Sequence, residues 1–415
     1  MGDLSQILAT INAVLWNETW ILIIAGTGVM FTLWSGFMQY RALTHGPKVV
    51  RGVYDDPDDP GAINHFQALS AALSGTVGLG NIGGVALAIT LGGPGAIFWM
   101  WVVGFLGMSI KFVEVTLSML YRNTDDPDNP HGGPMWVAGK ALKKIKPELG
   151  WLGSLLAVLF SLCVMTSAIT GGNMFQAWNV ADVTNEYFSV PGWVSGTILT
   201  LIVGAVIIGG IKRIGKGAGT LVPGMVAIYV IAGFYVLFAN FGEIPEMLAM
   251  IVRYAFTPTE ATGAFVGGTI GSAFLFGMKR AVFSNEAGQG SSAIAHAAAK
   301  TDEPVREGLV GGMEPFIDTI VVCTFTALII LSTGIWNRAP DVMLDVPPEP
   351  VRTEQGWQYP DLVLGPGAWQ DQEPVLMIVR GGVNADTGQN VHRVIGVVSA
   401  RDGGFVKDGF SAELD

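Results

Sequence analysis

The stretch ALSGTVGLGNIGGVALAIT, from Ala72 to Thr90, decides the fold class of this chain. It is apolar enough to lie in a membrane, yet five glycines interrupt it, and each glycine inside a helix costs roughly 1 kcal/mol relative to alanine. These glycines are Gly75, Gly78, Gly80, Gly83 and Gly84. Two hydroxyls, from Ser74 and Thr76, and the amide of Asn81 lie among them. The combination predicts a membrane helix that is broken where polar groups are needed.

The composition of the chain also indicates a membrane protein. Of the 415 residues, 50% are hydrophobic and only 14% are charged, whereas soluble domains carry about 25% charged residues. The 56 glycines agree, because glycine is more frequent in transmembrane helices. The formal charge of −11 argues against a nucleic-acid partner. The sequence shows no nucleophile paired with a base, no metal-binding cluster and no phosphate-binding loop. We therefore do not expect an enzyme, and we expect no catalytic residue.

Hydrophobic segments long enough to cross a bilayer, which takes roughly 20 residues, predict eight spans. Two spans are interrupted by glycines, namely the second and the one that contains GSAFLFGMKRAVFSNEAGQGSS from Gly271 onward. The predicted spans are Trp20–Tyr40, Ala62–Leu91, Pro94–Tyr121, Leu152–Thr170, Trp193–Ile211, Gly217–Phe241, Gly263–Phe283 and Leu309–Trp336. The sequence therefore predicts an all-α polytopic membrane protein with a transmembrane domain at residues 20–336.

Lysine and arginine follow every second span, which places those loops in the cytoplasm and the N-terminus outside. Residues 1–19 have helical apolar spacing and predict an amphipathic helix on the membrane surface, with a packed helix of the bundle as an equal alternative. Residues 337–415 form a polar, proline-rich tail. Its two β-like runs, EPVLMIVRG and VHRVIGVVS, predict an extracytoplasmic β-hairpin, and a mobile loop is the alternative.

Glycine breaks in membrane helices have two interpretations. An unwound backbone is tolerated in lipid only where it lines a cavity or is buried in protein. Secondary transporters use such breaks to bind anionic substrate groups on half-helix N-termini and cations on freed carbonyls. Glycines can instead allow close packing of helices. The hydroxyls and the amide between the glycines favour the binding interpretation.

Four stretches of the chain resemble the alanine or glycine:cation symporter family. They are SGTVGLGNIGG, LGGPGAIFWMWVVGFLG, SNEAGQGSS and GGMEPFIDTIVVCTFTALIIL, and the resemblance covers essentially Trp20 to Trp336. It implies sodium-coupled symport of alanine or glycine by alternating access, with sodium as the coupling ion and no other cofactor. It further implies the leucine-transporter fold, with two inverted repeats of five helices, in the lipid bilayer of the plasma membrane.

The same resemblance implies the site residues. One sodium ion would bind a backbone carbonyl and the asparagine side chain at the break, which match Thr76 and Asn81. A second sodium ion would bind carbonyls that match Ser74 and Val77. The substrate carboxylate would meet N–H groups at the break. The residues implied to contact the substrate are Gly75, Thr76, Gly78, Leu79, Gly80, Gln176, Phe276, Gly277 and Met278, with Gly277 and Met278 at the second break.

The chain departs from the family in length. Family members have eleven spans, so eight spans leave the second repeat incomplete and remove the helix that donates hydroxyl ligands to the second sodium ion. This predicts a truncated chain, with a split gene as the alternative. The functional alternatives are a partial chain or subunit that cannot transport alone, and a transporter coupled to protons rather than sodium. A channel would need repeated filter residues, which are absent.

Charged residues inside the spans carry further expectations. Lys111 and Glu114 are one turn apart and predict an i, i+3 ion pair, as a structural lock or, less favoured, a proton relay. Glu314 and Asp318 at the start of the eighth span are predicted to line the cation path. No role is predicted for His296.

Overall fold

The computed structural model describes residues 18–257, 270–334 and 336, together with six strand segments that follow Trp336. The predicted surface helix at residues 1–19 lies almost wholly outside these residues. The chain forms two compact units. The first comprises Met1–Val85, Met100–Ala239 and Met278–Thr326, and the second comprises Ala86–Trp99, Asn240–Gly277 and Ala327–Asp415.

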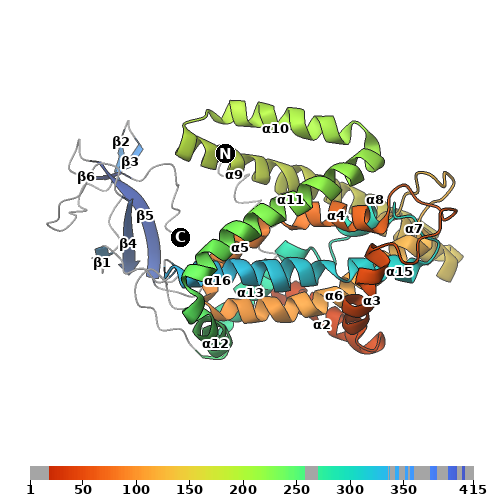
Figure 1. Cartoon of the computed structure of the whole chain (residues 1–415), viewed down its shortest axis with the longest axis horizontal. Coiled ribbons are helices and arrows are strands. Elements are labelled where there is room, and N and C mark those ends of the chain that lie inside the picture. The colour runs from red at the N-terminus through yellow and green to blue at the C-terminus, as the bar shows by residue number, and fades with distance from the viewer. Residues whose placement is uncertain are drawn as a thin grey trace. The chain divides into compact units, whose positions relative to one another are not determined.

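Helices make up the described chain as far as Ser332 (Figure 1). In chain order the described α-helices begin with α2 (Glu18–Trp34), α3 (Met38–Val50), α4 (His65–Thr76), α5 (Leu79–Gly92), α6 (Gly95–Tyr121), α7 (Pro134–Ile145), α8 (Gly150–Ser167), α9 (Phe175–Phe188), α10 (Gly192–Ile207) and α11 (Gly210–Ala239). They are followed by α12 (Ile244–Tyr254), α13 (Ile270–Asn285), α14 (Ser291–His296), α15 (Pro304–Gly311) and α16 (Cys323–Ser332). Short 3₁₀ turns η1 (Pro147–Leu149) and η3 (Phe241–Glu243) and π turns η2 (Ala168–Met174) and η4 (Phe316–Val322) complete the helical part.

Four helical stretches of the described chain are long and apolar enough to cross a membrane, and six if each of two bent pairs counts as one span. The four are Gly95–Tyr121, Pro147–Phe188, Gly210–Ala239 and Pro304–Ser332. The bent pairs are α2 with α3, at 75°, and α4 with α5, at 42°. The predicted seventh span begins within residues 258–269, outside the described part. A polytopic membrane protein agrees with these helices, and the count of eight spans stays a prediction.

The predicted break in the second span lies between α4 and α5. Helix α4 begins with a capping box, in which the side chain of Asn64 accepts a hydrogen bond from the Gln67 amide and Gln67 bonds back to the Asn64 amide. The helix ends at Thr76, because Val77 takes an extended conformation with φ −77° and ψ 100°. Helix α4 packs against α11 through a hydrophobic cluster that includes Leu73, Val77, Ala218 and Val222. This packing holds the first half of the broken span in place.

The second predicted break lies at a different position from the one expected. Helix α13 runs without interruption through Gly277 and Met278, so the expectation that these residues lie at a break is wrong. The chain leaves the helix only after Asn285, where Glu286, Gly288 and Gly290 have φ values of 52°, 88° and 83°. A Cβ atom at Gly277 would lie 2.3 Å from the carbonyl oxygen of Ala96. This glycine therefore allows two helices to approach closely and does not unwind one.

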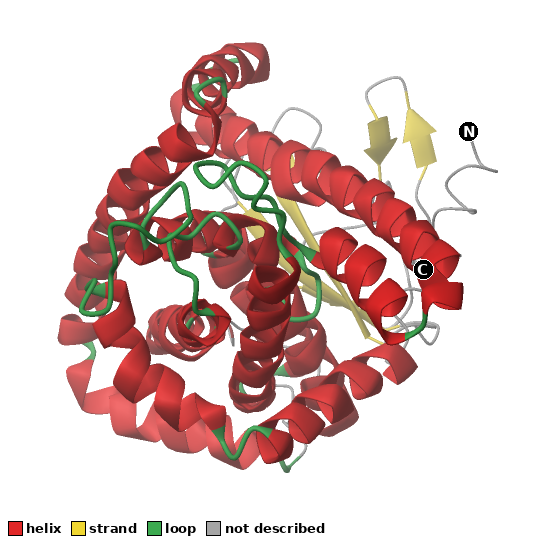
Figure 2. Cartoon of the chain, turned by 90° about the vertical axis from the view of Figure 1, so that its right-hand side faces the viewer, coloured by secondary structure: helices red, strands yellow, loops and turns green. Residues whose placement is uncertain are grey.

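The described strands after Trp336 form a six-stranded sheet (Figure 2). The two runs that sequence analysis marks as β-like become β4 (Pro374–Arg380) and β5 (Val391–Ser399), which pair antiparallel. The sheet order is β1-β4-β5-β6-β3-β2, and β1 pairs parallel with β4. The remaining strands are β1 (Val342–Leu344), β2 (Val351–Thr353), β3 (Gly356–Gln358) and β6 (Gly404–Val406). A sheet of this size buries backbone groups that an isolated hairpin leaves exposed.

Candidate substrate and cation site

The side chain of Asn81 links the break in the second span to two other segments of the first unit. It is 1% exposed at the start of α5. Its Oδ1 atom accepts a hydrogen bond of 2.8 Å from the amide of Gly78, inside the break. Its Nδ2 atom donates to the hydroxyl of Ser284 on α13 at 3.1 Å and to Oδ1 of Asp318 at 2.6 Å. One amide side chain thus holds the break, α13 and the π turn η4 together.

Asp318 is a buried carboxylate that is surrounded by neutral hydrogen-bond donors. Besides Asn81, the hydroxyls of Ser284 and Thr319 donate to its Oδ2 atom, at 2.7 and 2.9 Å. No lysine, arginine or histidine of the described helices lies within ion-pair distance of it. An ion that loses its hydration without a counter-charge costs several kcal/mol. A cation bound beside Asp318 would offset this cost.

The residues implied to bind sodium differ in what their side chains do. Thr76 is buried, and its Oγ1 atom has no hydrogen-bond partner in the described part of the chain. Such an atom is rare in a folded protein and is available to a ligand. Ser74 is exposed, and its hydroxyl donates to the carbonyl of Ala71 at 2.6 Å. Val77 is buried, and its backbone is extended.

The glycines at the break are not required by packing. A Cβ atom at Gly75 or Gly78 would meet no atom within 4 Å. At Gly80 the nearest atom would be the Cα of Ser284 at 3.6 Å, an ordinary van der Waals contact. The contrast with Gly277 is clear, because a Cβ atom there would overlap backbone. Close helix packing therefore explains Gly277 but not Gly75 or Gly78.

The other residues implied to contact the substrate are spread over several elements. Leu79 and Gly80 form the first turn of α5, and Gln176 is half-buried in α9. Met278 is buried in α13, in the first unit, whereas Phe276 and Gly277 belong to the second unit. No hydrogen bond within the described helices joins Gln176 to the Asn81 network. The structure thus gathers the residues of the first break and Ser284, a residue that sequence analysis missed.

The charged residues in the spans pair differently from the prediction. Lys111 pairs with Glu314 at 3.4 Å and donates to the hydroxyl of Ser292 at 2.7 Å. Glu114 accepts a hydrogen bond of 3.3 Å from the amide of Gly288, in the loop after α13. The predicted pair between Lys111 and Glu114 is therefore wrong, because each side chain turns to a segment that is distant in sequence.

His296 also has a defined place, contrary to the expectation that it has no role. It is fully buried between two carboxylates, Glu307 at its Nδ1 atom and Glu314 at its Nε2 atom. Sequence spacing gave no signal for this arrangement, because the two glutamates follow the histidine by 11 and 18 residues and approach it only after α15 folds back.

Comparison with known proteins gives a consistent result. A profile of the sodium:alanine symporter family matches residues 1–347. The sodium/alanine symporter AgcS of Methanococcus maripaludis is 44% identical over 333 residues, which cover 80% of this chain and 72% of AgcS. The probable sodium/glutamine symporter GlnT of Bacillus subtilis is 37% identical, over 80% of this chain and 67% of GlnT. The putative sodium/proton-dependent alanine carrier protein YrbD of Bacillus subtilis is also 37% identical, over 80% of this chain and 66% of YrbD. The chain therefore belongs to the sodium:alanine symporter family, whose members are cation-coupled amino-acid symporters and not enzymes.

Proposed function

We propose that this chain takes part in sodium-coupled symport of a small neutral amino acid, alanine or glycine, by alternating access. The observation that carries the proposal is Asp318, a fully buried carboxylate whose hydrogen-bond donors in the described helices are neutral and include the asparagine at the helix break. A buried negative charge of this kind would be stabilised by a bound cation, and a transported cation would bind beside it and then be released. Membership of the family supports the same reading.

Sodium would be held by oxygen atoms around the first break. Hard cations prefer carboxylate, carbonyl and hydroxyl oxygens. The break supplies the unpartnered hydroxyl of Thr76, the Oδ1 atom of Asn81 and, beside them, the carboxylate of Asp318. The carbonyls of Ser74 and Val77 are the proposed ligands of a second sodium ion.

The amino-acid carboxylate would bind at the start of α5. The first N–H groups of a helix have no partner within the helix and attract anions. The amide of Gly78 already donates to Asn81, so the N–H groups of Leu79 and Gly80 are the better candidates. Gly75 and Gly78 leave room beside them, and the bulk of Met278 on α13 suits a small side chain.

The arrangement in the membrane follows as part of the proposal. The protein would have the leucine-transporter fold in the plasma membrane, with the first repeat at residues 62–241 and the second beginning near residue 263. The N-terminus and the tail at residues 337–415 would lie outside the cell, and the helix at residues 1–19 would lie on the membrane surface.

One alternative stays open within the same fold. Proton coupling is favoured by the many buried titratable groups and by the likeness to YrbD, which its name describes as sodium/proton-dependent. The chain spans 72% of the length of AgcS. The likeness to GlnT makes glutamine a substrate to include in any assay.

The test is the sodium dependence of alanine binding by the purified protein, measured by calorimetry, for wild type and for Asp318→Asn. We expect the sodium concentration for half-maximal alanine binding to rise at least tenfold in Asp318→Asn, because the buried carboxylate next to the break is neutralised. Asp125→Asn, in an exposed loop, makes the same chemical change away from the site and serves as the control. An unchanged sodium dependence in folded Asp318→Asn would refute the assignment.

A further inference from the structure

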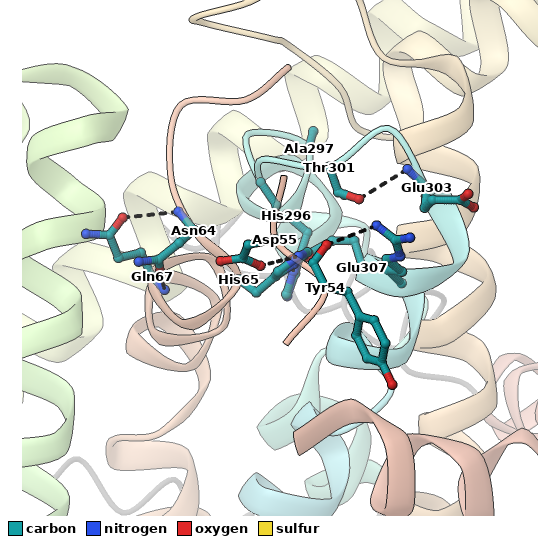
Figure 3. A network of polar contacts seen from close by, with 12 residues as sticks. Tyr54, Asp55, Asn64, His65, Gln67, His296, Ala297, Thr301, Glu303 and Glu307 are labelled. Carbon is teal, nitrogen blue, oxygen red and sulfur yellow. Dashed lines mark hydrogen bonds and ion pairs between the residues drawn. The ribbon is translucent and has the colours of Figure 1, made fainter. Parts of the chain in front are cut away.

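A continuous series of titratable side chains runs from an exposed loop into the interior of the first unit (Figure 3). It starts at Asp55, whose side chain is 46% exposed and lies 3.5 Å from Nε2 of His65. His65 is buried at the start of α4 and contacts Glu307 on α15. Glu307 contacts His296 on α14, and His296 contacts Glu314 at 2.7 Å. Four segments of the unit thus meet in one series.

Every interior member of this series uses two different atoms for its two neighbours. His65 faces Asp55 with Nε2 and Glu307 with Nδ1. Glu307 faces the two histidines with its two separate oxygens, Oε2 and Oε1. His296 faces Glu307 with Nδ1 and Glu314 with Nε2. Each histidine can therefore receive a proton on one nitrogen and release a different proton from the other, and Glu307 can accept a proton from one histidine and pass it to the other.

The geometry at His296 requires a proton. A neutral imidazole has one N–H donor and one acceptor nitrogen, so it can satisfy only one of two carboxylates. Both nitrogens of His296 face carboxylates in a site without solvent exposure. Only the imidazolium form donates to both. Burial alone would lower the pKa of His296, but the carboxylates of Glu307 and Glu314 outweigh this effect and raise the pKa to about 9.

The charges around His296 alternate in sign. The carboxylate of Glu307 faces it from α15, and that of Glu314 faces it from the residues between α15 and η4. Beyond them lie His65 on α4, next to Glu307, and Lys111 on α6, next to Glu314. Arg122 lies close by and donates to the carbonyl of Ala297. A proton on His296 thus sits between two carboxylates, of which Glu314 is paired with Lys111 on its far side and Glu307 is hydrogen-bonded to His65.

We propose that His296 is a proton-binding site and that Asp55, His65 and Glu307 form the path by which a proton reaches it. A proton passes from Asp55 to Nε2 of His65, while the Nδ1 proton of His65 passes to Glu307. The carboxylic acid formed in this way then turns about its Cγ–Cδ bond and delivers the same proton to Nδ1 of His296, which regenerates the carboxylate. Each step breaks one bond to hydrogen and forms one, and no other reactant is needed.

The proposal goes beyond sodium and amino-acid binding and does not depend on either. An occupied site ties α4, the half-helix before the break, to α14 and to α15. Helix α4 ends at the first glycine break, and α14 begins after the second. Proton binding would therefore stabilise the arrangement of the half-helices around the proposed substrate site.

Histidine-selective NMR of the purified full chain tests the site, because the sequence has only five histidines. We expect one histidine signal to titrate near pH 9 and to vanish in His296→Gln, whereas the exposed His131→Gln removes a different signal. Absence of that titration between pH 7 and pH 11 would overturn the site. If His296→Gln does not fold, the signal is assigned to His296 by a second variant, Glu307→Gln, which should broaden this signal selectively.

The path is tested by the rate at which the His296 N–H protons exchange with water. Asp55→Asn keeps the exposed loop intact and removes the entry carboxylate, and His65→Gln removes the next member. We expect exchange to slow at least tenfold in either variant, with the His296 titration retained. Exchange at the wild-type rate in both variants would refute the path. Calorimetry of alanine binding on the same samples reports separately on the proposed symport site.

Discussion

Adding one methyl group at Gly78 separates a binding role of the first break from a packing role. In the structure a Cβ atom at this position meets nothing within 4 Å, and the φ angle of Gly78 lies outside the left-handed region. Gly78→Ala should therefore leave the fold intact or stabilise it by about 0.4–1 kcal/mol, through the lower entropy of the unfolded chain. The matched control is Gly277→Ala, where Cβ would lie 2.3 Å from the Ala96 carbonyl oxygen. Overpacking of that kind costs about 1–3 kcal/mol.

In contrast to its small effect on stability, Gly78→Ala should have a large effect on alanine binding. A methyl group at Gly78 stands next to the N–H groups proposed for the substrate carboxylate, so alanine affinity should fall about tenfold, or about 1.4 kcal/mol. Calorimetry on purified protein in saturating sodium measures the affinity, and thermal unfolding of the same sample measures the stability. Gly277→Ala should lower the unfolding temperature, because the added methyl group overlaps the backbone of Ala96. Wild-type affinity in stable Gly78→Ala would refute the placement of the substrate carboxylate.

Three other predictions follow from the structure and the topology. Asn81→Ala should raise the sodium concentration for half-maximal alanine binding, because it removes an oxygen at the break and the hydrogen bond to Asp318. An unchanged sodium concentration together with lower stability would make Asn81 a packing residue. The pKa of His296 is raised from 6.5 to about 9, so its contribution of about 3 kcal/mol should be present below pH 6.5 and lost as the pH rises through 9. The thermal unfolding temperature should fall across that range, and a constant value would contradict it. A cysteine at Asp415, in a Cys163→Ser background, should react with an impermeant reagent added outside intact cells; reaction only after permeabilisation would reverse the topology.

Sequence alone predicted the first break but misplaced the second. The Ser74–Asn81 stretch combines glycines with polar side chains, and its backbone does leave the helix at Val77. Around Gly277 the sequence also shows a glycine between apolar residues, but there the glycine serves close contact with Ala96. Local sequence cannot distinguish these two cases, because the difference lies in what another helix places opposite the missing side chain.

Long-range pairing explains what sequence analysis missed in the candidate site. Asp318 was expected near the cation path from its position in a span, yet its partners Asn81 and Ser284 precede it by 237 and 34 residues. The partner of Lys111 is likewise Glu314, and the glutamate one turn away points elsewhere. Helical periodicity gives the face on which a residue lies, but not which face of another helix meets it.

The π turn at Phe316–Val322 adds one residue to a helical span and so fixes how the two ends of the span are rotated relative to each other. Pro304–Ser332 counts as one span, with Glu307 and Glu314 before the turn and Cys323 after it. A π turn holds one residue more than an α-helical turn. Deleting one residue there would restore the regular helix and rotate one end of the span by about 100° against the other. Glu307 and Glu314 on one side of the turn, and Cys323 next to Asn81 on the other, could then no longer all face their present partners. Alignments and designed chimaeras within this family must therefore preserve the length of this segment.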